Sequence, residues 1–182
     1  MPTHLWLVGM MGAGKTTVGR SLATRIAVPF VDTDELIVRS AGSSIPEIWE
    51  TEGEAGFRRR ETAALAEVAG RPDPGVIAAG GGAVLADGNI TLMRRHGTVV
   101  WLTATVPTLV ERTGDDPDRP LLAGPRPGPG TAVGGTHLHE RLAGILDERT
   151  PAYRTAAHHT IDTDATELDG VVDQLEALWR SM

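Results

Sequence analysis

Short apolar runs alternate with longer amphipathic segments along this chain. Each run is three or four residues long and is typical of a buried strand. Helical patterns fill the intervals between the runs, and this alternation predicts an α/β fold built on a parallel sheet. The expected strands lie at residues 5–8, 29–31, 76–79, 99–102 and 159–161.

Helix starts and faces can also be assigned from the pattern. The first helix is expected from about Lys15, because Val18, Leu22 and Ile26 recur every four residues on one face. A final helix is predicted from an apolar stripe at Leu168, Val171, Val172, Leu175 and Leu178. Capping-box spacing marks two helix starts, at Ser44 with Glu47 and at Asp164 with Glu167.

One segment fits neither pattern. Residues 123–136, AGPRPGPGTAVGGT, are too rich in glycine and proline for a helix or a central strand. We expect them to form a mobile loop or a lid. No internal repeat interrupts the remaining alternation of strands and helices.

Length and composition bound the class of protein. A chain of 182 residues suits a single domain, residues 1–182. It contains no cysteine, which excludes disulfides and thiolate metal sites and is compatible with the cytoplasm. No signal peptide or apolar run of membrane-spanning length is visible in the sequence. The net charge of -7 argues against broad binding to nucleic acid or anionic membranes, so an anionic ligand must meet a local basic cluster.

The single lysine of the chain points to a specific chemistry. Sixteen of the 17 basic Lys and Arg residues are arginines, and Lys15 is the exception. It lies in GMMGAGKT, which fits the phosphate-loop pattern G-x-x-x-x-G-K-[ST] with Gly9, Gly14 and Thr16 in the fixed places. The loop follows a predicted strand and opens a predicted helix, as nucleotide binding requires. A compact ammonium can reach phosphates inside such a tight loop, where a planar guanidinium is too wide. The alternative is a glycine-rich turn that matches by chance.

Two acidic residues follow the second expected strand, in the segment DTDEL. Asp32 and Asp34 point to the same side of an extended chain at the carboxyl edge of the sheet, where ligands of α/β proteins usually bind. One carboxylate suits Mg²⁺ and the other a substrate hydroxyl. The alternative is that Asp32 or Thr33 only caps the next helix.

Further charged and glycine-rich motifs suggest a substrate site. In GEAGFRRRE, Glu61 lies one helical turn after Arg58 and can hold its guanidinium for a bidentate acid. Residues 80–82 are three glycines in a row, which permits close approach of a ligand to the backbone. Arg119 in RPLLAG and Arg149 in ERTPAYR are further candidates, although an isolated arginine is more often a surface charge.

Taken in order, GMMGAGKTT, DTD, GEAGFRRRE, GGGAV, RPLLAG and ERTPAYR closely resemble the shikimate kinase family over nearly the whole chain. The resemblance implies a three-layer P-loop kinase fold with a five-stranded parallel sheet in the order 2-3-1-4-5. It also implies ATP-dependent phosphorylation of shikimate at its 3-hydroxyl, in chorismate and aromatic amino-acid synthesis. A substrate-binding region at about residues 32–61, a mobile lid at about 113–136 and a cytoplasmic monomer are expected.

The resemblance also implies roles for individual residues. Thr16 and Asp32 would hold Mg²⁺, the aspartate through water, and Arg112 would lie against adenine. Lys15, Asp34 and Arg119 are the implied catalytic residues, with Arg119 arriving on the lid. The ATP phosphates would be wrapped by Gly12, Ala13, Gly14, Lys15, Thr16 and Thr17.

On the substrate side, the resemblance implies that Arg58 and Arg149 bind the shikimate carboxylate. Asp34 would take the substrate hydroxyls, and the backbone at Gly81 would line the pocket. Whether Asp34 removes a proton or only aligns the hydroxyl stays open, because a loose phosphoryl-transfer transition state demands little of a base.

Two features depart from the family pattern. The region between RPLLAG and ERTPAYR is longer than in typical members, and Thr166 stands near a position where many relatives carry a basic residue. Two alternative functions fit these motifs less well. A gluconate-type or nucleotide kinase leaves DTD, GEAGFRRRE and GGG without a reason. A nucleotide-binding paralogue without catalysis is opposed by the intact Lys15, Asp34 and Arg58.

Overall fold

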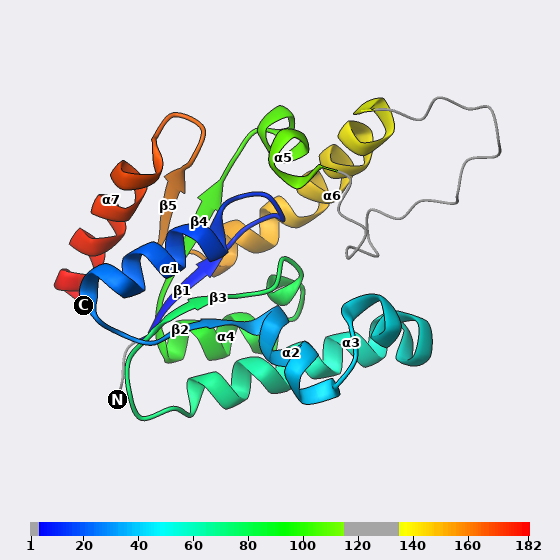
Figure 1. The fold of residues 1–182 in the computed structure, drawn as a ribbon, viewed down its shortest axis with the longest axis horizontal. Coiled ribbons are helices and arrows are strands. Elements are labelled where there is room, and N and C mark those ends of the chain that lie inside the picture. The colour runs from blue at the N-terminus through cyan, green and yellow to red at the C-terminus, as the bar shows by residue number, and fades with distance from the viewer. Residues whose placement is uncertain (1–3, 115–134) are drawn as a thin grey trace.

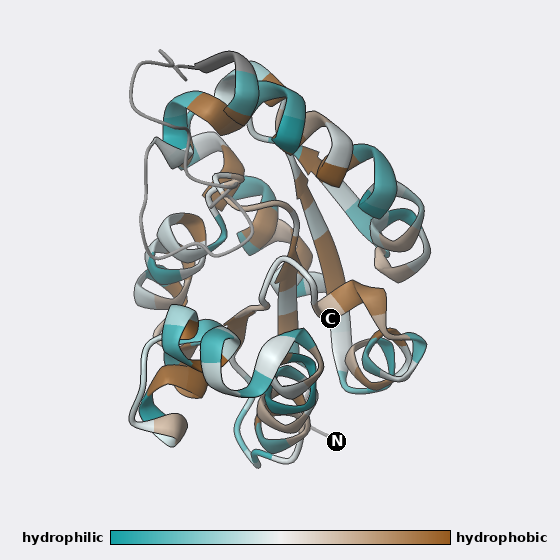
Figure 2. Ribbon diagram, turned by 90° about the vertical axis from the view of Figure 1, so that its right-hand side faces the viewer, coloured by the Kyte–Doolittle hydropathy of each residue, from teal (hydrophilic) through white to brown (hydrophobic). Residues whose placement is uncertain are grey.

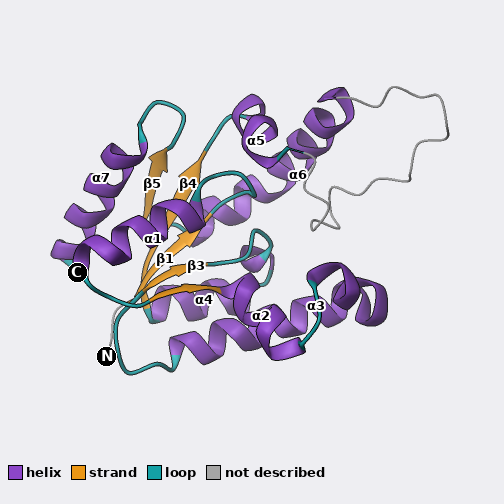
Figure 3. Cartoon of the chain, in the orientation of Figure 1, coloured by secondary structure: helices purple, strands orange, loops and turns teal. Residues whose placement is uncertain are grey.

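The computed structural model describes residues 4–114 and 135–182 and contains one parallel sheet (Figures 1 and 3). The strand order is β2-β3-β1-β4-β5, as expected. The strands are β1 (His4–Val8), β2 (Phe30–Asp32), β3 (Val76–Ala78), β4 (Gly97–Thr103) and β5 (His159–Asp162). The helices are α1 (Lys15–Ile26), α2 (Thr33–Ala41), α3 (Ile45–Ala69), α4 (Asp87–Arg95), α5 (Val106–Thr113), α6 (Gly135–Ala156) and α7 (Leu168–Ser181), with a 3₁₀ turn, η1 (Ala83–Leu85).

The central strands of the sheet are buried because helices cover both of its faces. Helices α1 and α7 pack together on one face, and α3, α4 and α6 pack against one another on the other (Figure 1). All of β1 and β3 is buried, which explains why these strands read as continuous apolar runs rather than alternating ones. Figure 2 shows the apolar strands at the centre and polar residues on the outer faces of the helices.

Apolar side chains gather in two clusters of different size. The main cluster surrounds β1, where Leu5, Trp6 and Leu7 are fully buried. A smaller cluster joins α2 to α3. Its buried members are Ile37, Ile48, Phe57 and Ala64. The expected substrate-binding region, residues 32–61, therefore has apolar packing of its own beside the sheet.

One of the two predicted capping boxes is confirmed. The Ser44 hydroxyl accepts from the Glu47 N–H at 3.4 Å, and the Glu47 carboxylate accepts from the Ser44 N–H at 2.7 Å. The prediction for Asp164 with Glu167 was wrong. Helix α7 begins at Leu168 without a side-chain cap, and the Asp164 carboxylate instead accepts from the Thr105 N–H at 2.6 Å. This carboxylate ties together the loops that follow β4 and β5.

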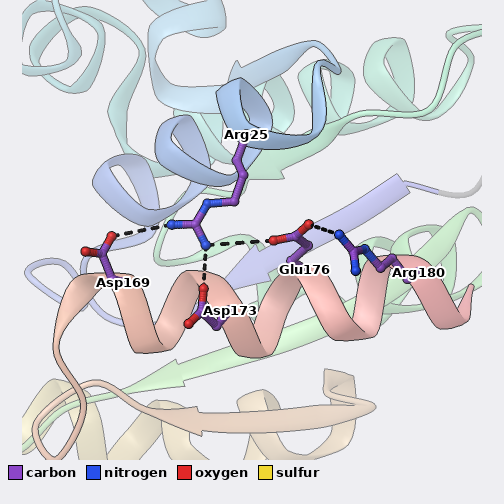
Figure 4. A network of polar contacts seen from close by, with 5 residues as sticks. All are labelled: Arg25, Asp169, Asp173, Glu176 and Arg180. Atoms are coloured by element: carbon purple, nitrogen blue, oxygen red, sulfur yellow. Dashed lines mark hydrogen bonds and ion pairs between the residues drawn. The ribbon is translucent and has the colours of Figure 1, made fainter.

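Charged side chains add to the packing between α1 and α7 (Figure 4). The Arg25 guanidinium lies among three carboxylates of α7, 3.4 Å from Asp169 and 3.8 Å from Glu176, with Asp173 also in contact. Arg180 contacts Glu176 from the other side. Arg25 and Glu176 are half-buried, but Asp169, Asp173 and Arg180 are largely exposed, so each pair contributes at most about 1 kcal/mol.

Helix α3 is broken near its first third. Gly53 has φ 67° and ψ -179°, a conformation that is essentially restricted to glycine, and the chain changes direction there. The residues on either side remain helical. The break separates the capped start of α3 from the long part that carries Arg58 and Glu61.

The structure describes only the two ends of the expected lid, and it also bears on the expected absence of a membrane span. The lid at about 113–136 has Thr113 and Gly114 at the end of α5 and Gly135 at the start of α6, and its remaining residues up to 134 lie outside the described residues. Across residues 4–114 and 135–182, no helix combines the length and apolar character that crossing a bilayer requires.

The backbone at Gly53 gives a stability prediction. Gly53→Ala should lower the free energy of unfolding by about 1–3 kcal/mol, because an alanine is strained at this φ and ψ although no atom lies within 4 Å of the new Cβ. Chemical denaturation measures the change. Gly144→Ala in α6 is the matched control, since its Cβ also meets nothing within 4 Å but its φ is negative. That variant should gain about 0.5–1 kcal/mol. Equal effects in both variants would contradict the strain at Gly53.

Candidate active site

The phosphate loop joins β1 to α1 and is shaped by its glycines. Gly12 has φ 80°, and a Cβ there would lie 2.6 Å from the Thr113 hydroxyl, so no other residue fits without a shift. The loop opens directly into the N-terminus of α1 at Lys15, where backbone N–H groups and the helix dipole favour an anion. The predicted strand, loop and helix are therefore all in place.

The single lysine lies back over this loop. Its Nζ donates to the carbonyl oxygens of Gly9 at 2.8 Å and Met10 at 3.0 Å. These contacts hold the ammonium beside the loop mouth and keep a half-buried charge satisfied.

Asp32 serves as both a helix cap and a partner of the phosphate loop. Its Oδ1 accepts from the Asp34 N–H at 3.0 Å and caps α2, and its Oδ2 accepts from the Thr16 hydroxyl at 2.7 Å. Asp32 therefore does cap α2, as the alternative interpretation holds. Capping uses only one of its two carboxylate oxygens, however.

A hydroxyl and a carboxylate at a phosphate loop form an oxygen donor pair that fits Mg²⁺. This ion is usually bound by one or two protein oxygens together with substrate phosphates and water. The described residues contain no group of three or more His, Cys, Asp or Glu side chains that could hold a metal ion by themselves. Thr16 and Asp32 are thus the protein groups that could hold the ion.

The predicted pairing of Arg58 with Glu61 is confirmed. The two side chains meet at 2.9 Å, and Glu54 contacts the other guanidinium nitrogen at 3.3 Å. The rings of Trp49 and Phe57 lie 6.0 Å and 5.6 Å from the guanidinium carbon, within the range of a cation–π contact. Carboxylates and aromatic faces together fix the direction of the Arg58 side chain.

Arg149 approaches the same place from α6. Its side chain is 5% exposed, and its Nη1 is buried without a hydrogen-bond partner among the described residues. Glu61 is 1% exposed, and burial raises the pKa of its carboxyl group while the charges of Arg58 and Arg149 oppose that rise. A buried guanidinium nitrogen with unused donor capacity favours binding of an anion such as a carboxylate.

The three consecutive glycines make room for these charged side chains. A Cβ on Gly82 would lie 2.0 Å from Arg58 Nη1, and one on Gly80 would lie 2.6 Å from Glu61 Oε1 and 2.8 Å from Asp34 Oδ1. The expectation was that missing side chains let a ligand approach the backbone. At Gly80 and Gly82 the space is already taken by side chains of the protein itself.

A cavity of about 560 Å³ connects the phosphate loop with these arginines. Every predicted site residue within the described ranges lines it except Ala13, which is buried in the core. Arg119 lies outside the described residues. The predicted residues that line the cavity are Gly12, Gly14, Lys15, Thr16, Thr17, Asp32, Asp34, Arg58, Gly81, Arg112 and Arg149.

Arg112 reaches the rim of this cavity from α5. Its guanidinium donates to the hydroxyl and the carbonyl oxygen of Thr163, both at 3.0 Å. These bonds fix the side chain beside the loop after β5, on the wall of the cavity. Thr166, near the position where many relatives carry a basic residue, belongs to the same loop.

Comparison with known proteins identifies the family. The model of the family "Shikimate kinase" matches residues 11–178. The chain belongs to the shikimate kinase family. The shikimate kinase of Salinibacter ruber is 46% identical over 164 residues, covering 90% of this chain and 78% of the relative. That of Symbiobacterium thermophilum is 46% identical over 174 residues, covering 94% and 93%.

A solved structure extends this likeness to the fold. The shikimate kinase from Acinetobacter baumannii in complex with shikimate is 38% identical and superposes with a TM-score of 0.87, covering 100% of this chain and 94% of that one. The expected fold class of shikimate kinases, a five-stranded parallel sheet in the order 2-3-1-4-5 with helices on both faces, is confirmed.

Several residues of this shikimate kinase site were missed from the sequence. Ile45, Trp49 and Phe57 line the cavity, but their spacing on a helix is the same as that of core residues. Tyr153 is fully buried, and its hydroxyl donates to the Gly81 carbonyl oxygen at 2.6 Å. Its position four residues after Arg149 was the one available signal, since residues at this spacing share a helix face.

The buried tyrosine gives a prediction for pH dependence. Burial raises the pKa of Tyr153 from 10.0 to about 12, although Arg149 opposes the rise. A raised pKa in the folded state contributes stability that is present below pH 10 and is lost as the pH rises towards 12. Between these values the free energy of unfolding should fall by up to about 1.4 kcal/mol per pH unit.

This chain contains one tyrosine, so the ultraviolet absorbance of tyrosinate measures the titration directly. We expect a midpoint near 12 in the folded protein and near 10 in denaturant. Tyr153→Phe should abolish the signal and this part of the alkaline instability. A native midpoint at the denatured value would contradict the burial of the hydroxyl.

Proposed function

We propose that this protein transfers the γ-phosphoryl group of ATP to the 3-hydroxyl of shikimate, giving shikimate 3-phosphate and ADP in chorismate and aromatic amino-acid synthesis. In addition to the family membership, one observation of the structure supports this proposal. A single cavity joins a phosphate loop to two partly or fully buried arginines, Arg58 and Arg149, that suit a carboxylate. The substrate of shikimate kinases is a small hydroxylated carboxylic acid that matches both ends of this cavity.

The phosphate loop supplies the nucleotide end. We assign the backbone of residues 12–17 to the ATP phosphates, and Lys15 to the phosphoryl group that is transferred. Bonds from Lys15 to two carbonyl oxygens support this, because they keep its ammonium beside the loop. In the transition state the ammonium would neutralise charge on the transferred group.

We assign Mg²⁺ to Thr16 and Asp32. Their 2.7 Å hydrogen bond supports the assignment, because it brings two oxygen donors together beside the phosphate loop. When bound there, this ion would neutralise charge that develops on the phosphoryl group during transfer. Asp32 also caps α2 and so fixes the start of the helix that carries Asp34.

The substrate end is assigned to Arg58, Arg149 and Asp34. Both arginines would bind the shikimate carboxylate, with the backbone at Gly81 lining the pocket between them. Glu61 keeps Arg58 in place and offsets part of the positive charge that remains when no acid is bound. Asp34 would take the substrate hydroxyl and point it along the line of attack.

Asp34 is proposed as a catalytic residue in one of two ways. It either accepts the hydroxyl proton or only orients the hydroxyl, and phosphoryl transfer requires mainly positioning and charge stabilisation. Its place beside Gly80 and on the cavity wall is compatible with both.

Two arginines complete the proposed nucleotide site. We assign Arg112 to adenine stacking, supported by the bonds to Thr163 that hold its guanidinium at the cavity rim. Arg119 is proposed to stabilise the transferred phosphoryl group. It lies outside the described residues, and its role rests on the RPLLAG motif.

We further propose a cytoplasmic monomer that acts on small molecules and not on nucleic acid or membranes. The net charge of -7 supports the part of this proposal that concerns nucleic acid and anionic membranes, because those surfaces attract excess positive charge.

The function is tested by a coupled assay of ADP release. We expect turnover that requires both Mg²⁺ and shikimate, with little or no stimulation by quinate, gluconate or nucleoside monophosphates. Turnover with another acceptor in place of shikimate would assign a different kinase activity to the same site. Binding of ATP without any shikimate-stimulated release of ADP would refute the proposed activity.

Substitution of the carboxylate clamp tests the roles of the residues. Arg58→Lys keeps the charge but loses the planar fork, so shikimate binding should weaken by about 1–3 kcal/mol while ATP binding changes little. Calorimetric titration with each ligand measures both effects. Arg59→Lys is the matched control, because Arg59 is an exposed neighbour that does not line the cavity. Equal losses for ATP and shikimate would show that Arg58 has another role.

A further inference from the structure

Two buried hydroxyl groups hold the glycine loop at residues 80–82. The Gly80 N–H donates to the Thr33 hydroxyl oxygen at 2.9 Å, and the Tyr153 hydroxyl donates to the Gly81 carbonyl oxygen at 2.6 Å. Both side chains are fully buried, with 0% exposure. Neither residue lines the cavity, so neither contacts a ligand there.

Tyr153 reaches the loop from α6. Its ring stacks on Trp101 of β4, with the ring centroids 5.5 Å apart and an angle of 16° between the planes. This packing leaves the hydroxyl directed at Gly81 from a fixed base. Burial keeps the pKa of Tyr153 near 12, well above neutral pH, so the hydroxyl stays protonated and remains a donor.

Thr33 reaches the loop from the opposite side. It is the first residue of α2, directly before Asp34, and its backbone follows the capping residue Asp32. Its hydroxyl therefore couples the position of Gly80 to the turn that presents Asp34. Because threonine is stiff at χ1, this short side chain has little freedom to follow a displaced loop.

The loop is thus tied to the two helices that bring Asp34 and Arg149 to the cavity. Asp34 immediately follows Thr33, and Arg149 lies one helical turn before Tyr153 on the same face. The loop has little room to move between them. A Cβ built on Gly80 lies 2.8 Å from Asp34 Oδ1, and one on Gly81 lies 3.6 Å from Arg149 Nη1.

We propose that Thr33 and Tyr153 are positioning residues, whose hydroxyls fix the glycine loop and thereby set the spacing between Asp34 and Arg149 to which the substrate binds. The inference rests on the proposed function, since it assigns these two residues to the shikimate end of the cavity. The glycine loop also lies near the phosphate loop, since a Cβ on Gly81 would be 3.6 Å from the Gly9 carbonyl oxygen. Among the described residues, however, the two hydroxyls bond to the glycine loop and not to the phosphate loop.

The test removes each hydroxyl and keeps the shape of the side chain. Tyr153→Phe retains the ring that stacks on Trp101, and Thr33→Val retains the branched Cβ. Each variant should raise the KM for shikimate roughly three- to tenfold, with the KM for ATP within about twofold of wild type. The double variant should depart from the product of the two single effects, because both bonds act on one loop.

Matched controls remove hydroxyls from the same two helices. Thr155→Val lies on α6, and Ser40→Ala lies on α2. Their hydroxyls donate within their own helices, to Pro151 at 3.0 Å and to Ile37 at 3.0 Å, and do not contact the loop. Both controls should keep the wild-type KM for shikimate.

Amide exchange across residues 79–85 gives a readout that needs no substrate. Exchange there should be faster in Tyr153→Phe and Thr33→Val than in wild type, and unchanged in the controls. A lower melting temperature with an unchanged KM for shikimate would overturn the proposal and assign both hydroxyls to stability alone. So would equal changes in KM for shikimate and ATP. If wild type itself showed no shikimate-dependent turnover, the proposed function would fail, while faster exchange in the variants would still establish the hold on the loop.

Discussion

The site depends on one constraint, which is that two arginines and a glutamate must be partly or fully buried close to one another. Arg58, Glu61 and Arg149 meet beside the end of β3, where burial disfavours each charge in isolation. They fit there because the strand is followed by three glycines, and a single methyl group on Gly82 would meet the Arg58 guanidinium at 2.0 Å. Because two arginines accompany one glutamate, these three side chains carry an excess of positive charge, and this excess suits them to bind a carboxylic acid.

Sheet topology brings this group to the phosphate loop. The loops that follow β1, β2 and β3 all leave the same edge of a parallel sheet, because the three strands are neighbours and run in one direction. The phosphate loop follows β1, Asp32 ends β2 and the glycines follow β3. Arg149 arrives separately on α6, and Tyr153 one turn later joins that helix to the glycines.

Much of this arrangement was predictable from local patterns. The strands, the start of α1 and the pairing of Arg58 with Glu61 follow from periodicity and spacing, which depend on neighbours along the chain. The resemblance to shikimate kinases supplied the strand order and the grouping of the site residues, and the sheet has that order.

The remainder was not predictable because it depends on distant partners. The Asp164 carboxylate has capping-box spacing with Glu167, yet it bonds to Thr105, 59 positions away in the chain. Glycine spacing reveals that side chains are missing, but the sequence does not say whether a ligand or Arg58 fills the space. Trp49 and Phe57 are equally ambiguous, since helical spacing of aromatic residues is shared by cores and cavity walls.

The division of the apolar core into two clusters bears on how evenly the molecule resists opening. Ile37, Ile48, Phe57 and Ala64 form a cluster much smaller than the one around β1, and it holds α2 against α3. Segments with fewer buried contacts open at lower free-energy cost than the central sheet does. Helices α2 and α3, which form the wall of the cavity at its substrate end, can therefore open as a local unit while the phosphate loop stays attached to β1. Local opening should therefore cost less free energy at the substrate end of the cavity than at the phosphate loop.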